Sequence, residues 1–517
     1  MKKGFTLIEL LAVILILGII ALIAIPTVNN ILKEARRGAF ESTLNNLEKA
    51  IEEKCTLEQI KNIEITTGYT ISNGVISPSL DIKGNLPNGT ITVNTNCEVA
   101  FTLSDQNFTG NKDFVGDIVV SDGSTDINVV YKEAILNGTD PVLSDGLIPV
   151  TIDNDGTVRK ANESSKWYSY EEKKWANAVL LTNSGQIESN GIIKEEYIKG
   201  YFVWIPRYKY KLFDMGNYDG YIENEEPVSV QKDPIEIVFE NKDTTPSVGT
   251  EVGQYHSHPA FNAFDVNGLW VGKFETSNET TIKPQLSSLQ NVNVRTMFES
   301  AYNFKRDSES HMMKNIEWGA VAYLTHSKYG RCTTTMCTDL NVNNNSEHLT
   351  GYSTVEGATY GASPSETQPY NTEVGYKATT TGNIFGIYDM SGGSEEVVAA
   401  YINQVPYSGF DEKPTNIYDS KYFDVYPSDT STYYYYKRIL GDATGELGPF
   451  YRLPNNQGWY SVYNNWYHDK GMFLYPNFPW LVRGGDYTEG AEAGILSFNR
   501  ESIGTSHEFS YRIVLTK

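Results

Sequence analysis

Residues 1–26 read MKKGFTLIELLAVILILGIIALIAIP, and this stretch decides how the rest of the chain is interpreted. Two lysines and a glycine precede an apolar run in which Glu9 is the single charged residue. The 21 residues from Phe5 to Ile25 would form a helix of roughly 31 Å, enough to cross the hydrocarbon core of a bilayer. The sequence therefore predicts that residues 5–25 lie in a membrane.

Three interpretations of this N-terminus compete: a cleaved secretory signal, a plain membrane anchor, and an anchor with a second role. A secretory signal has an apolar core of about 7–15 residues and ends at a small-x-small site. This run is longer, and residues 23–26, IAIP, offer no such site. A plain anchor leaves Glu9 unexplained, because an ionisable group in an apolar span costs about 2–3 kcal/mol unless it is paired. Glu9 therefore indicates a function with a partner.

The string KKGFTLIE at residues 2–9 resembles the processing signal of type IV pilins and the related pseudopilins. In that family a prepilin peptidase in the membrane cuts after the glycine, and the new N-terminal phenylalanine is methylated. The resemblance implies that residues 1–4 are a leader, with cleavage between Gly4 and Phe5 and N-methylation of Phe5. It implies that Glu9 serves assembly by neutralising the freed amine of a neighbouring subunit. The expected location is bacterial: the cell membrane first, and then a surface filament built with other pilin-like subunits.

After Pro26 the apolar positions mostly recur every three or four residues, which predicts that an amphipathic helix continues to about residue 54. This stripe consists of Val28, Ile31, Leu32, Ala35, Phe40, Leu44, Leu47 and Ile51. From about residue 63 the pattern changes to short strand-like runs, at 63–67, 74–76, 90–93, 98–103, 118–120 and 127–131. Residues 55–136 are therefore expected to form a small antiparallel sheet laid on the helix, as in a pilin head.

The four cysteines form two separated pairs, Cys55 with Cys97 and Cys332 with Cys337. Because the N-terminus implies export, two local disulfides are expected. A Cys55–Cys97 bond would tie the end of the helix to the sheet. A Cys332–Cys337 bond would close a small threonine-rich loop, and a redox-active pair is the alternative there.

A turn-rich linker is expected at residues 137–146, before a large domain at 147–517. That domain resembles the sulfatase-modifying-factor family, whose formylglycine-generating-enzyme fold is a variant of the C-type lectin fold. The resemblance implies that this domain is a large, loop-rich α+β domain of the C-type-lectin kind. Together with the long N-terminal helix and its small antiparallel sheet, the expected fold class is α+β. The matching motifs are FVWIPR (202–207), HPAF (258–261), GLWVGKFETS (268–277), EWGAVAYL (317–324), GNIFGIYDMSGG (382–393), LVRGGD (481–486) and FSYRIVL (509–515).

Several local features follow from these motifs. Residues 383–393 are expected to form a strand that runs into a tight turn at 391–393. Arg483 and Arg512 are expected to pair with buried carboxylates such as Glu275 or Glu396. Residues 395–398, EEVV, stand where the family has W-E-W-V, and the two missing tryptophans leave the packing of that corner in doubt.

Composition and motifs argue against several functions. The formal net charge of −22 disfavours binding to nucleic acid. The formylglycine-generating enzymes use two cysteines near the C-terminus, whereas this chain has none after Cys337, so enzymatic activity is not expected. No metal cluster is expected from the cysteine and histidine spacing, and His256 and His258 are interpreted as surface residues. The many Asp and Asn residues leave calcium open as a cofactor, but no EF-hand-like spacing assigns a site.

The remaining interpretation is a binding head. Aromatic and amide side chains are dense between residues 433 and 480, and such side chains suit adaptable recognition. A ligand face is expected at Tyr434, Trp459, Tyr463, Asn465 and Trp466, for an extracellular glycan or protein. The sequence thus favours a pilin-like filament subunit that displays a lectin-like head for adhesion. The alternatives are a minor pseudopilin of a secretion or DNA-uptake system and a surface enzyme of the formylglycine-generating type.

Overall fold

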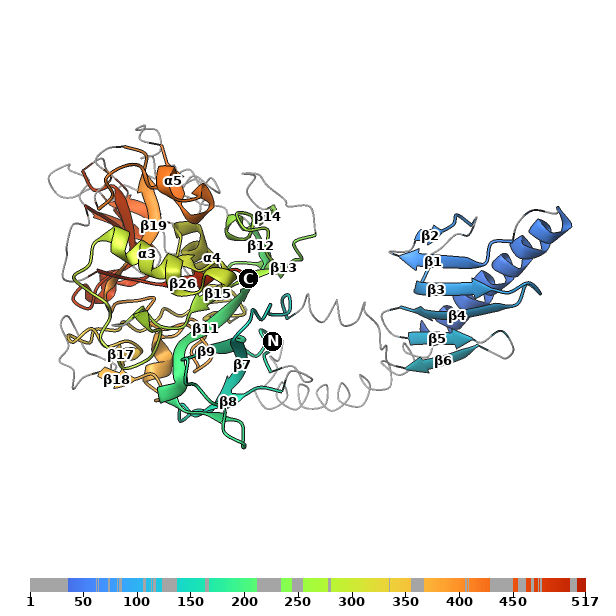
Figure 1. Cartoon of the computed structure of the whole chain (residues 1–517), viewed down its shortest axis with the longest axis horizontal. Helices are drawn as coiled ribbons and strands as arrows, with labels where there is room; N and C mark the ends of the chain where they lie inside the picture. The colour runs from blue at the N-terminus through green and yellow to red at the C-terminus, as the bar shows by residue number, and fades with distance from the viewer. Residues whose placement is uncertain are drawn as a thin grey trace, which may run out of the picture. The chain divides into compact units, whose positions relative to one another are not determined.

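The structure, a computed structural model, forms two compact units, one within Met1–Glu133 and one within Ala134–Lys517. Both combine largely antiparallel sheets with few helices (Figure 1). Each has its own hydrophobic core. The structure describes residues 36–61, 63, 65–72, 75–80, 82, 86–105, 108–112, 114, 118–122, 137–162, 167–211, 234–243, 254–277, 280–333, 335–354, 367–404, 407, 409–427, 450–453, 462–465, 469–472, 474, 477–502 and 509–517.

The N-terminal unit consists of a helix over residues 36–60 and one antiparallel sheet. The strand order is β2-β1-β3-β4-β5-β6, so strands that follow one another along the chain are also neighbours in space. The strands are β1 (Gly68–Ser72), β2 (Val75–Ser77), β3 (Asn88–Val93), β4 (Val99–Ser104), β5 (Phe108–Lys112) and β6 (Val119–Asp122).

The helix buries the apolar stripe that its spacing predicts. Phe40, Leu44, Leu47 and Ile51 are at most 4% exposed and share a core with the inward-facing residues of the strands. Burial of one such side chain contributes about 1.5–3 kcal/mol. In β5, Gly110 lets the helix approach closely, because a Cβ built there would lie 2.2 Å from Leu44 Cδ1.

Two boundaries in this unit differ from the sequence-based prediction. The helix runs to residue 60 rather than 54, and the described residues between 63 and 67 form no strand. The Glu58 carboxylate accounts for both differences, because it accepts hydrogen bonds from the Thr66 backbone N–H (2.8 Å) and hydroxyl (3.1 Å). These bonds hold Thr66 against the last helical turn, so strand pairing begins at Gly68. The expected strand at 127–131 lies outside the described residues.

In the part of the chain that the structure describes, no helix is both long and apolar enough to cross a bilayer. The expected membrane part, residues 5–25, lies outside the described residues.

The C-terminal unit contains a large antiparallel sheet in the order β10-β8-β7-β9-β11-β15-β26-β16 and a smaller sheet in which β19 is central. The strands of the large sheet are β7 (Leu147–Ile152), β8 (Val158–Lys160), β9 (Asn177–Leu181), β10 (Ile192–Ile193), β11 (Ile198–Pro206), β15 (Gly268–Gly272), β16 (His311–Met312) and β26 (Ile513–Leu515). Those of the smaller sheet are β19 (Glu395–Ile402), β20 (Asp424–Tyr426), β23 (Trp480–Gly484), β24 (Gly494–Glu501) and β25 (Phe509–Tyr511).

Shorter elements complete this unit. The remaining strands are β12 (Tyr208–Lys211), β13 (Ile237–Phe239), β14 (Tyr255–Ser257), β17 (Tyr352–Thr354), β18 (Thr367–Pro369), β21 (Phe450–Leu453) and β22 (Val462–Asn465). The α-helices are α3 (Val294–Phe304), α4 (Asn315–Thr325) and α5 (Pro414–Ile417). The 3-10 helices are η1 (Glu195–Tyr197), η2 (Pro259–Phe261), η4 (Arg306–Ser308), η6 (Gly375–Ala378), η7 (Ser420–Tyr422) and η10 (Gly490–Glu492).

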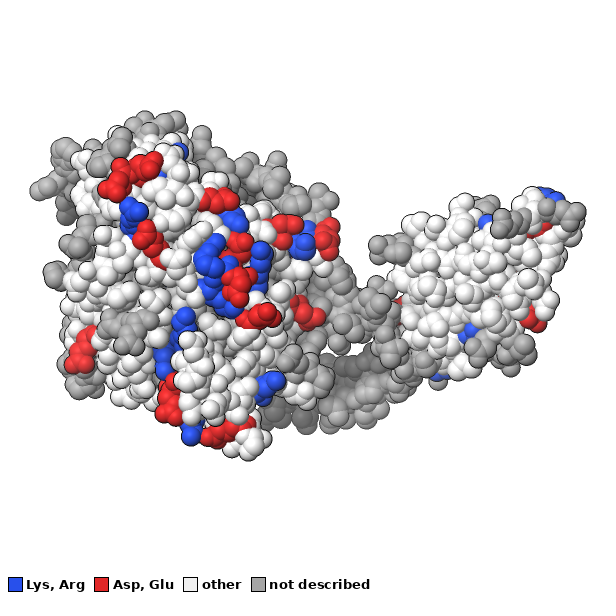
Figure 2. All heavy atoms as spheres, in the orientation of Figure 1, with Lys and Arg blue, Asp and Glu red and all other residues white. Residues whose placement is uncertain are grey.

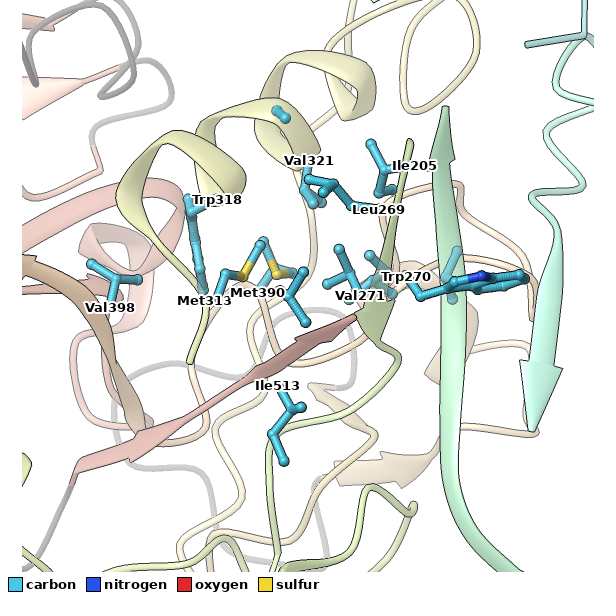
Figure 3. Packing of buried hydrophobic residues seen from close by; sticks show 14 of the residues in the cluster. Ile205, Leu269, Trp270, Val271, Met313, Trp318, Val321, Met390, Val398 and Ile513 are labelled. Atoms are coloured by element: carbon cyan, nitrogen blue, oxygen red, sulfur yellow. The ribbon is translucent and has the colours of Figure 1, made fainter. Parts of the chain in front are cut away.

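Helix α4 lies at the centre of this unit, and all of its residues are buried. The Trp318 indole N–H donates to the Ile495 carbonyl (2.6 Å), and the Tyr208 hydroxyl donates to the Ala320 carbonyl (2.7 Å). Figure 3 shows Trp318 reaching from α4 toward Met313, within the same apolar core. The motif at residues 317–324 therefore lies within α4, which begins two residues before it.

The predicted strand over residues 383–390 is wrong, because this segment forms successive turns. The Asn383 side chain accepts from the Thr381 hydroxyl (2.9 Å) and from the Phe385 N–H (2.9 Å), which favours a turn over an extended chain. The tight turn that follows is present, with positive φ at Gly392 (72°) and Gly393 (80°). Such angles favour glycine, which has no Cβ.

Residues 137–146, the expected linker, make specific contacts with the C-terminal unit. The Trp204 indole donates to the Thr139 carbonyl (3.0 Å), and the Trp270 indole donates to the Val142 carbonyl (2.6 Å). Trp204 and Trp270 are also opposite each other in β11 and β15. Two buried indoles thus fix this segment against the large sheet.

Candidate functional site

The residues expected to direct processing and assembly are Gly4, Phe5 and Glu9, and all three lie outside the described residues. Their roles stay predictions. What the structure describes is the continuation of the same segment, the helix over residues 36–60, which is fixed to the sheet through its apolar face.

Cys55 and Cys97 form a disulfide that joins this helix to the turn between β3 and β4. Their Cα atoms are 5.6 Å apart, and 42 positions separate them in the sequence. The Asn94 side chain shapes the turn by accepting from the backbone N–H groups of Asn96 (2.9 Å) and Glu98 (3.0 Å). Cys97 has a φ of 63°, which aims its side chain at the helix. The bond therefore has the helix-to-sheet role that the sequence predicts.

Replacing Cys55 and Cys97 together with serine is expected to destabilise the N-terminal unit by about 2–4 kcal/mol, because the unfolded chain regains the freedom of a long loop. Hydrogen exchange followed by mass spectrometry measures this as faster exchange in β1 to β4. The matched control replaces Cys332 and Cys337, which are only 5 positions apart and belong to the other unit. Unchanged protection of β1 to β4 in the first variant would contradict the expected role.

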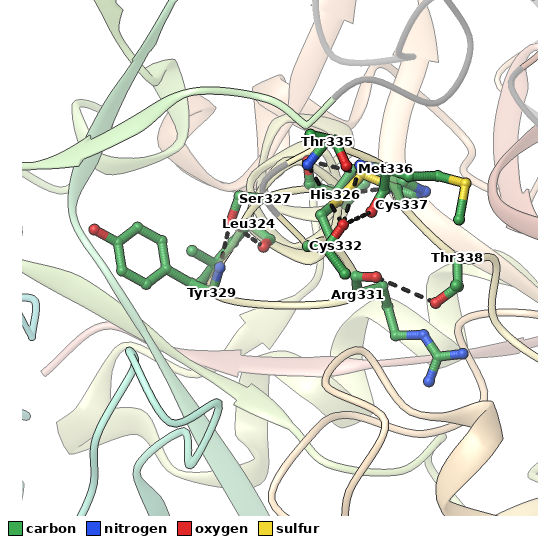
Figure 4. Close-up of a disulfide and its surroundings, with 12 residues drawn as sticks. Leu324, His326, Ser327, Tyr329, Arg331, Cys332, Thr335, Met336, Cys337 and Thr338 are labelled. Carbon is green, nitrogen blue, oxygen red and sulfur yellow. Dashed lines mark hydrogen bonds between the residues drawn. A yellow bond between two sulfur atoms is a disulfide. The ribbon is translucent and has the colours of Figure 1, made fainter. Parts of the chain in front are cut away.

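Cys332 and Cys337 also form a disulfide, and both side chains are buried (Figure 4). The loop that they close follows α4, and the Thr333 N–H donates across it to the Met336 carbonyl (2.8 Å). The Lys173 ammonium donates to the Cys332 carbonyl (3.0 Å). This arrangement agrees with the expected loop-closing bond, and the redox alternative stays a hypothesis.

The expected ligand face falls mostly outside the described residues. Tyr434, Trp459 and Trp466 are not among them, whereas Tyr463 and Asn465 belong to β22. This strand pairs with β21, with Tyr463 opposite Arg452 and Asn465 opposite Phe450. The structure thus places two of the five residues on one hairpin, and the ligand face stays a prediction.

The two neighbouring histidines are buried, so their assignment to the surface is wrong. His256 is 2% and His258 is 0% exposed. His258 Nδ1 accepts from the Ala260 N–H (3.3 Å) and so caps η2, and its ring packs edge-on against Tyr323. Tyr208 and Tyr210 on the neighbouring strand β12 both contact the His258 ring. These two aromatic residues are the feature of the sequence that could have indicated a buried histidine.

Arg512 and Glu396 form a buried ion pair between the two sheets. Arg512 Nε donates to Glu396 Oε2 (3.0 Å), and Nη2 donates to Oε1. The guanidinium also donates to the carbonyls of Gly272 (2.7 Å) and Tyr388 (3.0 Å). The expected pairing of Arg512 is therefore present. Arg483 donates to Asn315 Oδ1 (2.7 Å) and to the Ser497 carbonyl (2.9 Å), and its positive charge opposes the rise that burial causes in the pKa of Asp469.

Two further carboxyl groups surround this pair. Burial raises the pKa of Glu275 well above its ordinary value, and the nearby Asp389 and Glu396 add to the effect. Glu275 accepts from the Ser394 N–H (3.1 Å) and from the Ser288 hydroxyl. Asp389 accepts from the Gly351 N–H (2.8 Å) and from Asn343 Nδ2 (2.9 Å). Three buried carboxyl groups thus share one guanidinium, and burial beside the other two keeps the pKa of Glu275 raised.

Residues 395–398, which stand where the resembling family has two tryptophans, form a buried segment that contains two carboxyl groups. Glu395 and Glu396 begin β19, all of whose residues are buried. The Asn499 amide donates to Glu395 Oε1 (3.2 Å), and Lys470 forms an ion pair with Glu489 nearby. Burial and the negative charge of Glu489 raise the pKa of Glu395 to about 8.

The C-terminal unit is expected to lose stability as pH rises from about 5 to 8.5. The pKa of Glu395 is raised from its ordinary value of 4.5 to about 8, so its stabilising protonated form is complete below pH 4.5 and is lost as pH rises through about 8. Burial also raises the pKa of Glu396 to about 7, which acts in the same direction. At about 1.4 kcal/mol for each pKa unit, the shift of Glu395 corresponds to a loss on the order of 4 kcal/mol.

Urea unfolding at several pH values, read by tryptophan fluorescence, measures this dependence. All eight tryptophans follow residue 166, so the fluorescence reports the C-terminal unit alone. Glu395→Gln should flatten the dependence, whereas the exposed control Glu172→Gln should leave it unchanged. Stability that rises from pH 5 to 8.5 in the wild-type protein would contradict the prediction.

Among the described residues, no group of three or more His, Cys, Asp or Glu side chains is placed to hold a metal ion. The described part of the chain therefore identifies no residues for the calcium site that the composition left open.

Comparisons with known proteins concern the N-terminus. Residues 1–25 match the family model described as "Prokaryotic N-terminal methylation motif". The N-terminal part is also similar to the type IV major fimbrial protein FimA of Dichelobacter nodosus, with 41% identity to one FimA sequence and 40% to another over 73 residues. These residues are 14% of this chain and 45–46% of the relatives, so the chain spans about half the length of the curated relatives it matches. The N-terminus is thus of the type IV pilin kind.

Proposed function

We propose that this chain is a pilin-like subunit of a bacterial surface filament. The match of residues 1–25 to the N-terminal methylation motif carries this proposal. In it, the prepilin peptidase cuts between Gly4 and Phe5, the amine of Phe5 is methylated, and the apolar segment anchors the subunit in the cell membrane. The same segment then packs with other pilin-like subunits, and Glu9 neutralises the N-terminal amine of a neighbour.

An exposed apolar surface on the N-terminal unit supports assembly. Leu57, Ile60 and Ile63, at the end of the helix, are 52%, 74% and 57% exposed. Clustered aliphatic side chains in water favour contact with a partner. A neighbouring subunit in a filament is the partner that the methylation motif suggests.

The C-terminal unit is proposed to be a lectin-like head for adhesion or ligand recognition. The resemblance of its motifs to the sulfatase-modifying-factor family supports this, and the motifs fall on elements of the core such as β15, α4 and β23. The absence of cysteines after Cys337 favours binding over the copper-dependent chemistry of that family.

Mass spectrometry of the mature N-terminus tests the filament proposal. The protein isolated from its bacterium should begin at Phe5 and carry one methyl group on its amine. A chain that begins at Met1, or that is cut elsewhere, would overturn the proposal. Immunogold imaging then separates an adhesive pilus subunit, seen along or at the tip of surface fibres, from a pseudopilin that serves a secretion or DNA-uptake system.

A further inference from the structure

A pocket of about 430 Å³ lies on the C-terminal unit, between one flank of α3 and the start of β11. Its volume falls within the range of about 300–1,000 Å³ in which proteins hold small molecules. Thr296, Ser300 and Asn303 line it from α3, at spacings that place them along one side of the helix. Lys199 and Thr280 form the facing wall.

Backbone pairing holds the two parts of that facing wall together. The Ile282 N–H donates to the Lys199 carbonyl (3.1 Å), and the Tyr201 N–H donates to the Ile282 carbonyl (3.0 Å). The segment that carries Thr280 is thereby fixed beside the start of β11. The pocket wall is therefore built on paired backbone and on a helix, both of which position side chains well.

Lys199 supplies the positive charge of the pocket. Among the described residues no carboxylate pairs with its ammonium, which lies 4.2 Å from the centre of the Phe304 ring. Partial burial lowers the pKa of Lys199, and the positive charge of Lys305 lowers it further. Other lysines of this unit have carboxylate partners, such as Lys305 with Asp307 (2.8 Å). On the face in Figure 2, basic and acidic side chains lie next to one another in the same way.

The acidic residue of the pocket does not neutralise Lys199. Glu299 lines the pocket but accepts from Arg295 Nε (2.8 Å) and from the Tyr418 hydroxyl (2.7 Å). Both bonds lower the pKa of Glu299, and the guanidinium of Arg295 compensates its charge. Among the described residues that line the pocket, Lys199 thus carries a positive charge that no carboxylate compensates.

The rest of the pocket is rich in groups that both donate and accept hydrogen bonds. The Thr296 hydroxyl donates to Asn293 Oδ1 (3.1 Å) and keeps its lone pairs available, and the Asn303 amide is exposed. Behind the wall the buried Tyr511 hydroxyl lies beside the hydroxyl groups of Ser300, Thr280 and Thr276.

We propose that this pocket binds an acidic sugar residue, with Lys199 holding the carboxylate. One compensating charge fits a monocarboxylate, and paired donor–acceptor groups along α3 fit the hydroxyls of a sugar ring. A phosphate would favour an arginine fork, and no arginine is among the described residues that line the pocket. This inference rests on the proposed role of the C-terminal unit as a binding head and gives that head a ligand class.

Isothermal titration of the full-length protein in detergent micelles with glucuronic acid tests the inference. Glucose, which lacks the carboxylate, should bind at least five-fold more weakly, and acetate, which lacks the ring, should not compete. Lys199→Gln should weaken binding of glucuronic acid at least ten-fold, and Ser300→Ala combined with Asn303→Ala severalfold. The matched control is Lys283→Gln, because Lys283 already pairs with Glu195 (3.4 Å). Thermal unfolding verifies that each variant is folded.

Equal binding by the Lys199→Gln variant, or equal competition by acetate, would overturn the inference. The second outcome would mean an adventitious ion only. A disaccharide that ends in glucuronate distinguishes a glycan terminus from the free acid as the ligand. Absence of any sugar binding would refute this pocket and leave the filament proposal standing, because methylated Phe5 is measured independently. If the Lys199→Gln variant still bound sugar, the proposal that the C-terminal unit is a binding head would stand. Only the assignment of the binding site to this pocket would then be refuted.

Discussion

Replacing Arg512 with methionine is expected to destabilise the C-terminal unit by about 3–5 kcal/mol. Methionine keeps the apolar stem and removes the guanidinium that compensates Glu396. It also removes the donor to the Gly272 and Tyr388 carbonyls, which are buried between the sheets. A buried carboxylate without its partner costs more than the pair contributes, because the desolvation of the remaining charge is no longer offset.

The position of Arg512 in the fold adds to this effect. β25 pairs with β19 in the smaller sheet, and β26 pairs with β15 in the large one. Arg512 is the residue between β25 and β26, so the chain passes from one sheet to the other at its side chain. Loss of the ion pair therefore weakens the connection of the two sheets as well as one local contact.

Urea unfolding read by tryptophan fluorescence measures the loss. Arg159→Met is the matched control, because Arg159 pairs with Asp153 on the surface and such exposed pairs contribute about 0–1 kcal/mol. The difference between Arg512→Met and the wild-type protein should narrow at pH 5, where protonation removes the charge of Glu396. Adding Glu396→Gln should recover part of the stability. A loss no larger than that of the control would contradict the expected role.

Elements within one short window of sequence were open to prediction. The spacing of Leu44, Leu47 and Ile51 identifies the buried face of the helix, and the strand-like runs at 90–93 and 98–103 fall on β3 and β4. In each case the residues that decide the structure are neighbours along the chain, so their pattern is visible without the fold.

Features that depend on distant residues were not open to prediction. The hydrogen bonds from Thr66 to Glu58 hold the chain at the end of the helix, so that β1 begins only at Gly68. Neither residue type predicts this by itself. The pocket shows the same limit, because Lys199 and Ser300 meet only when α3 packs beside β11. Lysine and serine are common on any protein surface, so the sequence does not mark these two residues as a candidate site. The stretch 433–480, in contrast, is marked as a candidate site by its high content of aromatic residues.

Replacing Glu9 with alanine is expected to leave the chain in the membrane and to reduce its incorporation into filaments at least ten-fold. Membrane insertion depends on the apolar run from Leu10 to Ile25, which the substitution extends rather than interrupts. Assembly depends on the proposed pairing of Glu9 with the amine of a neighbour's Phe5. Loss of a buried ion pair costs about 3–5 kcal/mol, and each 1.4 kcal/mol is tenfold in an association constant.

The measurement compares the membrane fraction with sheared surface filaments by immunoblot. Glu41→Ala is the matched control, because Glu41 lies on the described helix in an exposed pair with Arg37 and should assemble normally. Glu9→Gln separates the effect of the charge from the effect of side-chain size. Glutamine keeps the side-chain length but cannot neutralise an amine, so this variant should be incorporated into filaments as poorly as Glu9→Ala. Normal filament incorporation of both Glu9 variants would remove the assembly role, and Glu9 would then be a carboxylate that a plain anchor tolerates near its membrane surface.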